Sequence, residues 1–243
     1  MFLINALKII FLLGFLIFIH EGGHFLVAKL CKVRVNEFAI GFGPTVWKRQ
    51  GKETKYALRL IPLGGFVRME GEMESSEAKD AFNNASIPKR IAIVAAGAIV
   101  NILFGTIVFW VLISVMYGSL GTGLTATGKF LLSTVESLKM LATGQIGTKD
   151  LTGPIGISQV VSSTEGLAQY VYILAVVSVS LGITNLLPIP ALDGGKILLL
   201  IIEWIRKKPL KEEMEVQIQL LGFSFLIALS VYVTYNDVIR IIN

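Results

Sequence analysis

Four stretches of this sequence are apolar over enough residues to limit the folds open to the chain. They cover residues 2–30, 91–117, 168–187 and 216–235. An α-helix rises about 1.5 Å per residue, so about 20 residues cross a hydrocarbon core about 30 Å thick. Charged residues make up only 16% of the chain, against roughly 25% in soluble domains. The sequence therefore predicts a polytopic membrane protein with about four transmembrane helices.

Lysine and arginine are distributed unevenly among the connections between these stretches. Residues 32–90 contain eleven, residues 118–167 contain three, and the turn 206–211 contains four. Positive residues favour cytoplasmic loops, so the first and third connections are predicted to be cytoplasmic and both termini extracytoplasmic. We expect a multi-pass protein of the inner or plasma membrane. Because the basic residues form no continuous tract, the net charge of +5 does not indicate a nucleic-acid partner.

Residues 35–70 differ from the rest of the chain because they alternate and are rich in β-formers and glycine. Val35–Ile40 and Thr54–Leu60 are separated by Gly41-Phe42-Gly43-Pro44, and Gly64-Gly65-Phe66-Val67 follows. This pattern predicts short antiparallel strands with tight turns. The sheet is either soluble, on the cytoplasmic face, or dips toward the membrane, where it can pair with an extended substrate. The predicted fold class is all-α, with a small membrane-associated antiparallel β insertion.

The connection 118–167 is predicted to lie outside the cell. It opens with Gly118–Gly123, whose composition is that of a flexible linker. We expect an amphipathic helix over residues 129–143 and a turn at residues 153–156. The predicted segments are 1–31 (first transmembrane helix), 32–90 (cytoplasmic or re-entrant β region), 91–117 (second helix), 118–167 (external connection), 168–205 (third, broken helix) and 206–243 (fourth helix and C-terminus).

The motif His20-Glu21-Gly22-Gly23-His24 lies inside the first apolar stretch. On a helix, residues i and i+4 share one face, so both imidazoles can reach one metal ion while the glutamate faces a water. Two exposed histidines on a soluble helix give the same pattern by chance, but ionisable groups within an apolar span are costly and normally functional. The motif therefore predicts one zinc ion per chain.

The chain has no third histidine, so a third zinc ligand has to be a carboxylate or Cys31. Asp193 is the favoured candidate because Pro188 and Pro190 break the third apolar stretch just before it. A broken helix is tolerated at membrane depth only where it is buried in protein or lines a cavity. The alternative for Asp193 is an N-cap of the following helix. Cys31 is interpreted as an inert apolar side chain near a helix end.

Two motifs, HEGGH in the first span and NLLPIPALDGG in the third, make the chain resemble the site-2 protease family of intramembrane zinc metalloproteases. The resemblance is nearest to the bacterial branch that cleaves anti-sigma factors and signal-peptide remnants, and it covers nearly the whole chain. Further matching segments are Gly41–Pro44, Pro62–Val67, Ala96–Asn101 and Gly153–Ile155.

The resemblance implies a role for each residue of the candidate site. His20, His24 and Asp193 are expected to bind Zn²⁺, and Glu21 is expected to be the catalytic base. Asn185 is expected to orient the substrate or the developing oxyanion. The chain departs from the family at Ala98, where proline is usual. The connection 118–167 is also too short for the PDZ domain of this branch, which is therefore absent or deleted.

The predicted function is hydrolysis of a peptide bond within a single-pass transmembrane protein or peptide, in the lipid bilayer, by a metal-activated water. Gly64, Gly65 and Phe66 are candidate substrate-binding residues because the β region can hold an extended chain. Two other functions are open: a catalytically inactive membrane scaffold or chaperone, and a metal transporter. Intact Glu21 and Asp193 argue against the first, and the scarcity of other polar residues in the spans argues against the second.

Overall fold

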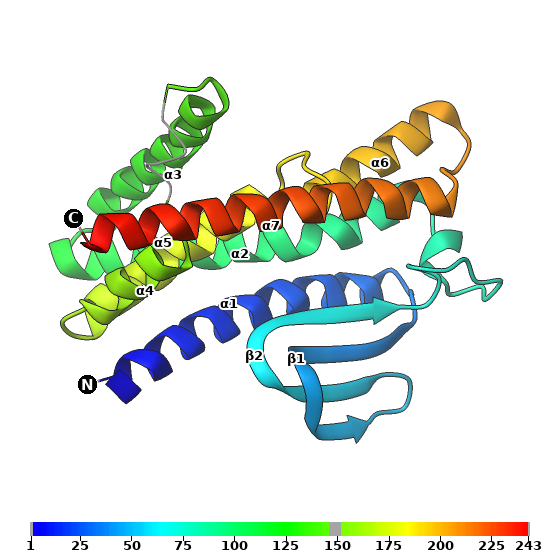
Figure 1. Cartoon of the computed structure of the whole chain (residues 1–243), viewed down its shortest axis with the longest axis horizontal. Coiled ribbons are helices and arrows are strands. Elements are labelled where there is room, and N and C mark those ends of the chain that lie inside the picture. Colours follow the sequence, from blue (N-terminus) through cyan, green and yellow to red (C-terminus); the bar gives the residue numbers. More distant parts are fainter. Residues whose placement is uncertain (1, 146–151, 243) are drawn as a thin grey trace. The chain divides into compact units, whose positions relative to one another are not determined.

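Figure 1 shows the chain as a computed structural model, which describes residues 2–145 and 152–242. Residues 146–151 of the predicted external connection lie outside the described residues. The elements follow in the order α1 (Phe2–Leu30), β1 (Val35–Gln50), β2 (Lys55–Met69), the short 3-10 helix η1 (Phe82–Asn84), α2 (Ile87–Tyr117), α3 (Leu120–Ala142), α4 (Pro154–Ser162), α5 (Leu167–Asn185), α6 (Asp193–Arg206) and α7 (Glu212–Ile242).

Among the described residues, four helices are long and apolar enough to cross a membrane, as the sequence predicts. These spans are Leu3–Leu30 in α1, Ile87–Tyr117 in α2, Leu167–Asn185 in α5 and Glu212–Arg240 in α7. The helix α2 begins earlier than residue 91 because Pro88 is tolerated in the first turn, where a backbone N–H has no helical partner. The predicted fold class, four membrane helices with a small antiparallel β insertion, is confirmed.

The connection after α2 is more helical than predicted. The flexible linker expected over 118–123 is wrong, because α3 begins at Leu120 and the side chain of Ser119 caps it by accepting a hydrogen bond from a first-turn N–H. The turn expected at 153–156 is also wrong, because Pro154 opens α4 with the fixed φ that suits the first turn of a helix.

The contacts divide the chain into two compact units. Unit 1 contains residues 1–9, 102–180 and 223–243, and unit 2 contains residues 10–101 and 181–222. All the candidate site residues belong to unit 2.

In unit 2, β1 and β2 form one antiparallel sheet in which both strands bend and therefore pair more than once. Segment 37–40 of β1 pairs on one side with residues 65–68 of β2 and on the other side with residues 55–58. Residues 55–59 pair in turn with residues 45–50. The prediction of antiparallel pairing is confirmed, but two long bent strands replace the expected short ones.

Glycines at the bends explain why this part of the sequence is so rich in them. Gly41 has a φ of +88° and Gly64 a φ of +135°, both in the region that residues with a Cβ rarely adopt. At Gly64 the ring of Phe42 also occupies the space that a Cβ would need. The sheet therefore depends on glycine at the point where β2 turns into its second half.

The core of unit 2 connects the C-terminal end of α1 with the sheet, α2 and α6. Its buried members are Ala28, Val33, Val35, Met69, Phe82, Ile93, Val94 and Leu200. Cys31 packs against this cluster, in agreement with its interpretation as an apolar side chain.

The break between α5 and α6 is a tight loop. A Cβ on Gly194 would collide with the carbonyl groups of Leu186 and Leu187, so the loop closes only over bare backbone. The N–H of Ala191 donates a 2.6 Å hydrogen bond to the side-chain oxygen of Gln219 in α7. These contacts fix the point at which α6, and with it Asp193, begins.

In unit 1, polar groups join helices that are otherwise apolar. The carboxylate of Asp237 is 2% exposed and accepts hydrogen bonds from the backbone N–H groups of Gly153, at 3.3 Å, and Gly156, at 2.9 Å. The ammonium group of Lys8 donates to the carbonyl and hydroxyl oxygens of Thr164, each at 3.2 Å. Both contacts satisfy polar groups that would be costly to leave unpaired in an apolar environment.

Candidate metal centre

The helix α1 presents the two histidines of the sequence to the same point. His20 and His24 are one helical turn apart, and their Nε2 atoms lie 3.2 Å from each other. Their side chains are only 12% and 11% exposed. The spacing of the HEGGH motif therefore places both imidazoles on one face, as predicted.

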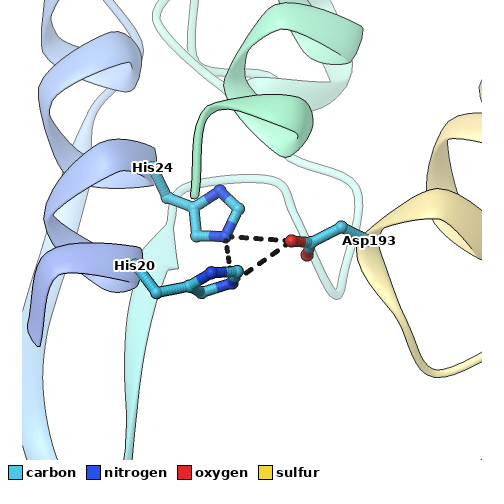
Figure 2. Close-up of side chains that lie close together, drawn as sticks. All are labelled: His20, His24 and Asp193. Atoms are coloured by element: carbon cyan, nitrogen blue, oxygen red, sulfur yellow. Dashed lines mark hydrogen bonds and ion pairs between the residues drawn. The ribbon is translucent and has the colours of Figure 1, made fainter. Parts of the chain in front are cut away.

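Asp193, the first residue of α6, completes the group (Figure 2). Its Oδ2 atom lies 3.2 Å from Nε2 of His20 and 3.6 Å from Nε2 of His24. One ligand atom from each of the three residues lies within 4.8 Å of the other two. Among the described His, Cys, Asp and Glu residues, these three form a group that could hold a metal ion. The N-cap alternative for Asp193 is wrong, because Leu192 is the N-cap and Asp193 is already helical.

The second nitrogen of each imidazole has a polar neighbour from α2. Nδ1 of His24 lies 2.8 Å from the carbonyl oxygen of Ile93, which can only accept, so Nδ1 carries the proton. Nδ1 of His20 lies 3.4 Å from the side-chain nitrogen of Asn101. The proton on Nδ1 of His24 leaves its Nε2 with a lone pair on the side of Asp193.

This arrangement of acceptors fits a bound cation. The Oδ2 atom of Asp193 is buried and accepts no hydrogen bond from any described residue, although two ring nitrogens approach it within 4 Å. A buried carboxylate oxygen without a hydrogen bond is costly, and a cation between it and the two imidazoles would remove that cost. Two imidazoles and one carboxylate are a ligand set typical of catalytic zinc, with a fourth position left open.

Small residues on α2 leave room for the imidazoles. A Cβ on Gly97 would collide with Nε2 of His24, and a Cβ on Gly23 would lie 2.6 Å from the carbonyl oxygen of Ala96. By contrast, a Cβ on Gly22 would meet nothing within 4 Å. The close approach of α1 and α2 at the site therefore depends on Gly23 and Gly97, and not on Gly22.

Glu21 faces the edge of the sheet. Its Cγ atom lies 3.0 Å from the position that a Cβ on Gly65 would occupy, so Gly65 allows the second half of β2 to pass beside Glu21. Phe66 points to the other face, where the guanidinium groups of Arg59 and Arg68 lie 5.0 and 5.6 Å from its ring centroid. Of the predicted substrate-binding residues, Gly65 is therefore the one whose contact with Glu21 is described.

Asn185 is the last residue of α5 and is partly exposed. Within the described residues, no hydrogen bond or ion pair joins it to His20, His24 or Asp193. Its predicted role stays a prediction.

Sequence reasoning missed an ion pair beside the site. The ammonium group of Lys196, three residues after Asp193 in α6, lies 2.8 Å from the carboxylate of Glu72. Glu72 lies among the acidic residues of segment 70–80, for which no chemical role is predicted. The pair ties the loop after β2 to the helix that carries Asp193. Its only signal in the sequence was a lysine one helical turn beyond that aspartate.

The sequence of the chain matches known proteins over nearly its whole length. A model of peptidase family M50 matches residues 8–229. A protein of Clostridium acetobutylicum, provisionally named a zinc metalloprotease, is 29% identical over 98% of this chain and 98% of the relative. A protein of Fusobacterium nucleatum with the same provisional name is 26% identical over 96% and 98% of the two chains.

A higher identity is confined to part of the chain. The regulator of sigma-E protease RseP of Escherichia coli is 45% identical over 114 residues, which are 45% of this chain and 25% of the relative. The alignment with the Clostridium acetobutylicum protein has 334 positions, more than the 243 residues of this chain, so that relative contains residues with no counterpart here.

Proposed function

The chain belongs to peptidase family M50, the site-2 proteases, and from this premise we propose which of its residues carry out the reaction and on what substrate. It is a zinc-dependent protease and a membrane protein. We propose that His20, His24 and Asp193 bind the zinc ion, that Glu21 is the catalytic base, and that the substrates are single-pass transmembrane proteins.

The observation that carries this proposal is the convergence of two imidazole nitrogens and one carboxylate oxygen at a single point. The two Nε2 atoms and Oδ2 of Asp193 meet beside a membrane-spanning helix, where unpaired polar groups are costly. A purely structural role would leave the buried Oδ2 atom without a hydrogen bond from the described residues. A bound cation would supply that missing partner and hold the three side chains together.

Each residue of the chain then has a definable task. Zinc supplies Lewis-acid chemistry, since it polarises the scissile carbonyl and makes water acidic enough to lose a proton near neutral pH. The carboxylate of Glu21 takes the proton from the attacking water and transfers it to the amide nitrogen, which leaves as an amine. The carbonyl of Ile93 holds the imidazole of His24 in the orientation and tautomer that this requires, and Asn101 contacts Nδ1 of His20.

The second half of β2 is the proposed binding site for an extended segment of the substrate. Among the described residues, segment 65–68 pairs with β1 on one side only, and Gly65 brings this segment beside Glu21. A peptide carbonyl in a helix is engaged in i→i−4 bonding, so the substrate has to unwind before attack. Main-chain hydrogen bonds from Gly64, Gly65 and Phe66 would hold the extended segment, and Asn185 would orient it.

The proposed substrates are remnants of single-pass proteins already trimmed by another protease, such as anti-sigma factors or signal-peptide remnants. The distribution of lysine and arginine supports an orientation with both termini outside the cell. In that orientation the HEGGH motif, ten to six residues before the end of α1, lies toward the cytoplasmic half of its span.

The test is the substitution Glu21→Gln in the purified full-length protein. We expect cleavage of a model transmembrane segment to fall below detection, while one zinc per chain remains bound, because the amide keeps the shape of the side chain but cannot take a proton. The matched control is Glu74→Gln, an exposed carboxylate of the same unit. Full cleavage by Glu21→Gln, or loss of zinc from it, would contradict the assignment of Glu21 as base.

A further inference from the structure

The sheet of unit 2 has one apolar and one charged face. Side chains alternate between the two faces along a strand, and residues that pair across strands lie on the same face. The register pairs Phe38 with Tyr56, Ile40 with Leu58, and Leu58 with Trp47, and we call the side formed by these five residues the apolar face. The opposite side carries Glu37, which is 5% exposed and paired with Lys55, Arg59 and Arg68.

The sheet lies beside α1 (Figure 1), and its apolar face contacts the membrane-spanning part of that helix. The ring of Phe38 lies 6.1 Å from that of Phe18 and 5.3 Å from that of Phe25, and the ring of Tyr56 lies 6.1 Å from that of Phe25. Farther along, the carbonyl oxygen of Pro62 lies 3.7 Å from the position of a Cβ on Gly14. The sheet therefore runs alongside the helix and not beyond its end.

These contacts give the sheet a depth relative to α1. The 28-residue span is about 42 Å long, about 12 Å more than the hydrocarbon core. Phe18 lies about 18 Å from the end of the helix at Leu30, so it is in the hydrocarbon even if all the excess length is at that end. Lys29 pairs with Glu53 at 2.8 Å, which puts the β1–β2 turn near the membrane surface.

A pocket of about 540 Å³ opens on the apolar face. Its lining includes Phe38, Ile40, Trp47, Arg49, Tyr56 and Leu58. The side nearer α1 is closed, since Phe38 is only 9% exposed, whereas Trp47 is 53% and Leu58 44% exposed. The pocket is therefore an apolar recess that is open on the side of Trp47 and Leu58.

The one cation in this lining set, Arg49, is not neutralised by the protein. Three other cations near this sheet have carboxylate partners: Lys55 and Arg59 bind Glu37, and Lys29 binds Glu53. Within the described residues, no carboxylate lies at ion-pair distance from Arg49. Arg49 pairs in register with Tyr56, one step from the turn, so its guanidinium lies at the shallow end of the pocket.

The pocket and the proposed metal site use different parts of the sheet. Gly65, which lies beside Glu21, belongs to the segment on one side of residues 37–40. Apart from Phe38 and Ile40, the pocket lining comes from residues 47–58 on the other side. An occupant of the pocket therefore does not need to be the peptide that reaches Glu21.

We propose that this pocket binds a phospholipid with an anionic headgroup, with an acyl chain along Trp47 and Leu58 and the phosphate at Arg49. The depth of the apolar face favours a lipid, because the surface next to it in a membrane is hydrocarbon. An uncompensated arginine beside a tryptophan at the boundary suits a headgroup of negative charge. The inference does not depend on the proposed catalytic residues.

The test measures quenching of Trp47 by brominated lipids. Trp110 and Trp204 are replaced by phenylalanine in the full chain, which leaves Trp47 as the sole tryptophan. The protein is placed in phosphatidylcholine vesicles in which either phosphatidylglycerol or an equal share of the phosphatidylcholine carries bromine on its acyl chains. We expect brominated phosphatidylglycerol to quench Trp47 several-fold more effectively.

Two substitutions in β1 distinguish binding of the headgroup at the pocket from a general effect of surface charge. Arg49→Gln should reduce the preference for phosphatidylglycerol by about fivefold, whereas Lys48→Gln, which removes the same charge from the opposite face of β1, should change it less than twofold. Zinc content and cleavage by each variant report that the fold is intact.

Three results would overturn the proposal. Equal quenching by the two brominated lipids would show no preference for the anionic headgroup. Equal losses in Arg49→Gln and Lys48→Gln would show a diffuse charge effect. Relief of the quenching by a transmembrane substrate segment would show that a peptide, and not a lipid, is the occupant.

Discussion

Asp193 in unit 2 and Asp237 in unit 1 are both withdrawn from solvent in an apolar chain, and they are held in opposite ways. Asp237 faces two donors, the N–H groups of Gly153 and Gly156 at the start of α4. Asp193 faces two ring nitrogens and, among the described residues, has no donor to its Oδ2 atom. The first is a complete interaction within the protein, and we propose that a bound cation completes the second.

The comparison gives a physical rule for separating a structural carboxylate from a ligand. Both aspartates have an apolar sequence context, although Asp237 is the more buried, at 2% exposed against 20% for the side chain of Asp193. The surrounding atoms differ, since backbone N–H groups at a helix start stabilise a negative charge without a metal. The following substitutions test that rule, in order of decreasing expected effect.

Asp193→Asn should have the largest effect. The amide keeps the shape of the side chain but loses its charge, so we expect zinc affinity to fall at least about a hundredfold and cleavage to disappear. The measurement is zinc content after titration with a competing chelator. Asp237→Asn is the matched control and should keep one zinc per chain. If Asp193→Asn bound zinc as the unaltered protein does, the contrast between the two aspartates would be lost.

Gly97→Ala should be next. The added methyl group would collide with Nε2 of His24, so the imidazole has to move, and we expect zinc affinity to fall about tenfold to a hundredfold. Gly22→Ala adds the same group within the HEGGH motif, where nothing lies within 4 Å, and should leave zinc binding unchanged. Equal zinc affinities of the two variants would show that space at the imidazoles does not limit the site.

Asp237→Asn should destabilise the protein without affecting the metal. The neutral amide weakens two charge-assisted hydrogen bonds, so we expect a loss of about 1.5–3 kcal/mol and a Tm lower by about 3–10 °C in a thermal melt. Glu136→Gln, which changes an exposed carboxylate of α3, should leave the Tm unchanged. An unchanged Tm in Asp237→Asn would mean that α4 does not depend on this carboxylate.

Glu37 shows a third arrangement, in which side-chain cations pair with a buried carboxylate. Its contribution to the stability of the fold should depend on pH. Burial opposes ionisation, but hydrogen bonds from Arg59 and Lys55 outweigh it and hold the pKa of Glu37 below its ordinary value of 4.5. The unfolded chain therefore binds this proton more readily. The stabilisation is complete above the ordinary pKa and is lost as the pH falls through the lowered pKa.

The corresponding measurement is the Tm of Glu37→Gln and of the unaltered protein as a function of pH. We expect the variant to melt about 2–4 °C lower near neutral pH, for a loss of about 1 kcal/mol, and the difference to shrink in acid. Glu74→Gln should show no such dependence. A difference that grew toward low pH would reverse the assigned direction of the pKa of Glu37.

The sequence predicted those features that follow from local periodicity. The spacing of His20 and His24 put both imidazoles on one face because helix geometry is nearly invariant. The apolar runs predicted four spans for the same reason, and the prolines before Asp193 predicted a break. The segment 118–123 was misread because glycine, serine and threonine occur both in linkers and at helix starts, and the cap formed by Ser119 decides between them.

The features that could not be predicted arise from contacts between distant segments. The passage of Gly65 beside Glu21 depends on how two bent strands fold back, which no local pattern encodes. The pair of Glu72 and Lys196 joins residues 124 positions apart, and either residue alone resembles an ordinary solvated charge. Such partners become visible only when the chain is folded.

The site takes His20 and His24 from the first helix and Asp193 from the sixth, so a bound ion closes most of the chain into a ring. The ion then acts as a cross-link that removes conformations from the partly unfolded chain. The loss of chain entropy, and with it the stabilisation of the folded state, is greater for a long loop than for a short one. Removing the ion should therefore loosen the loop before α6 as well as stop the chemistry. Hydrogen exchange at α6 with and without chelator would measure that second effect.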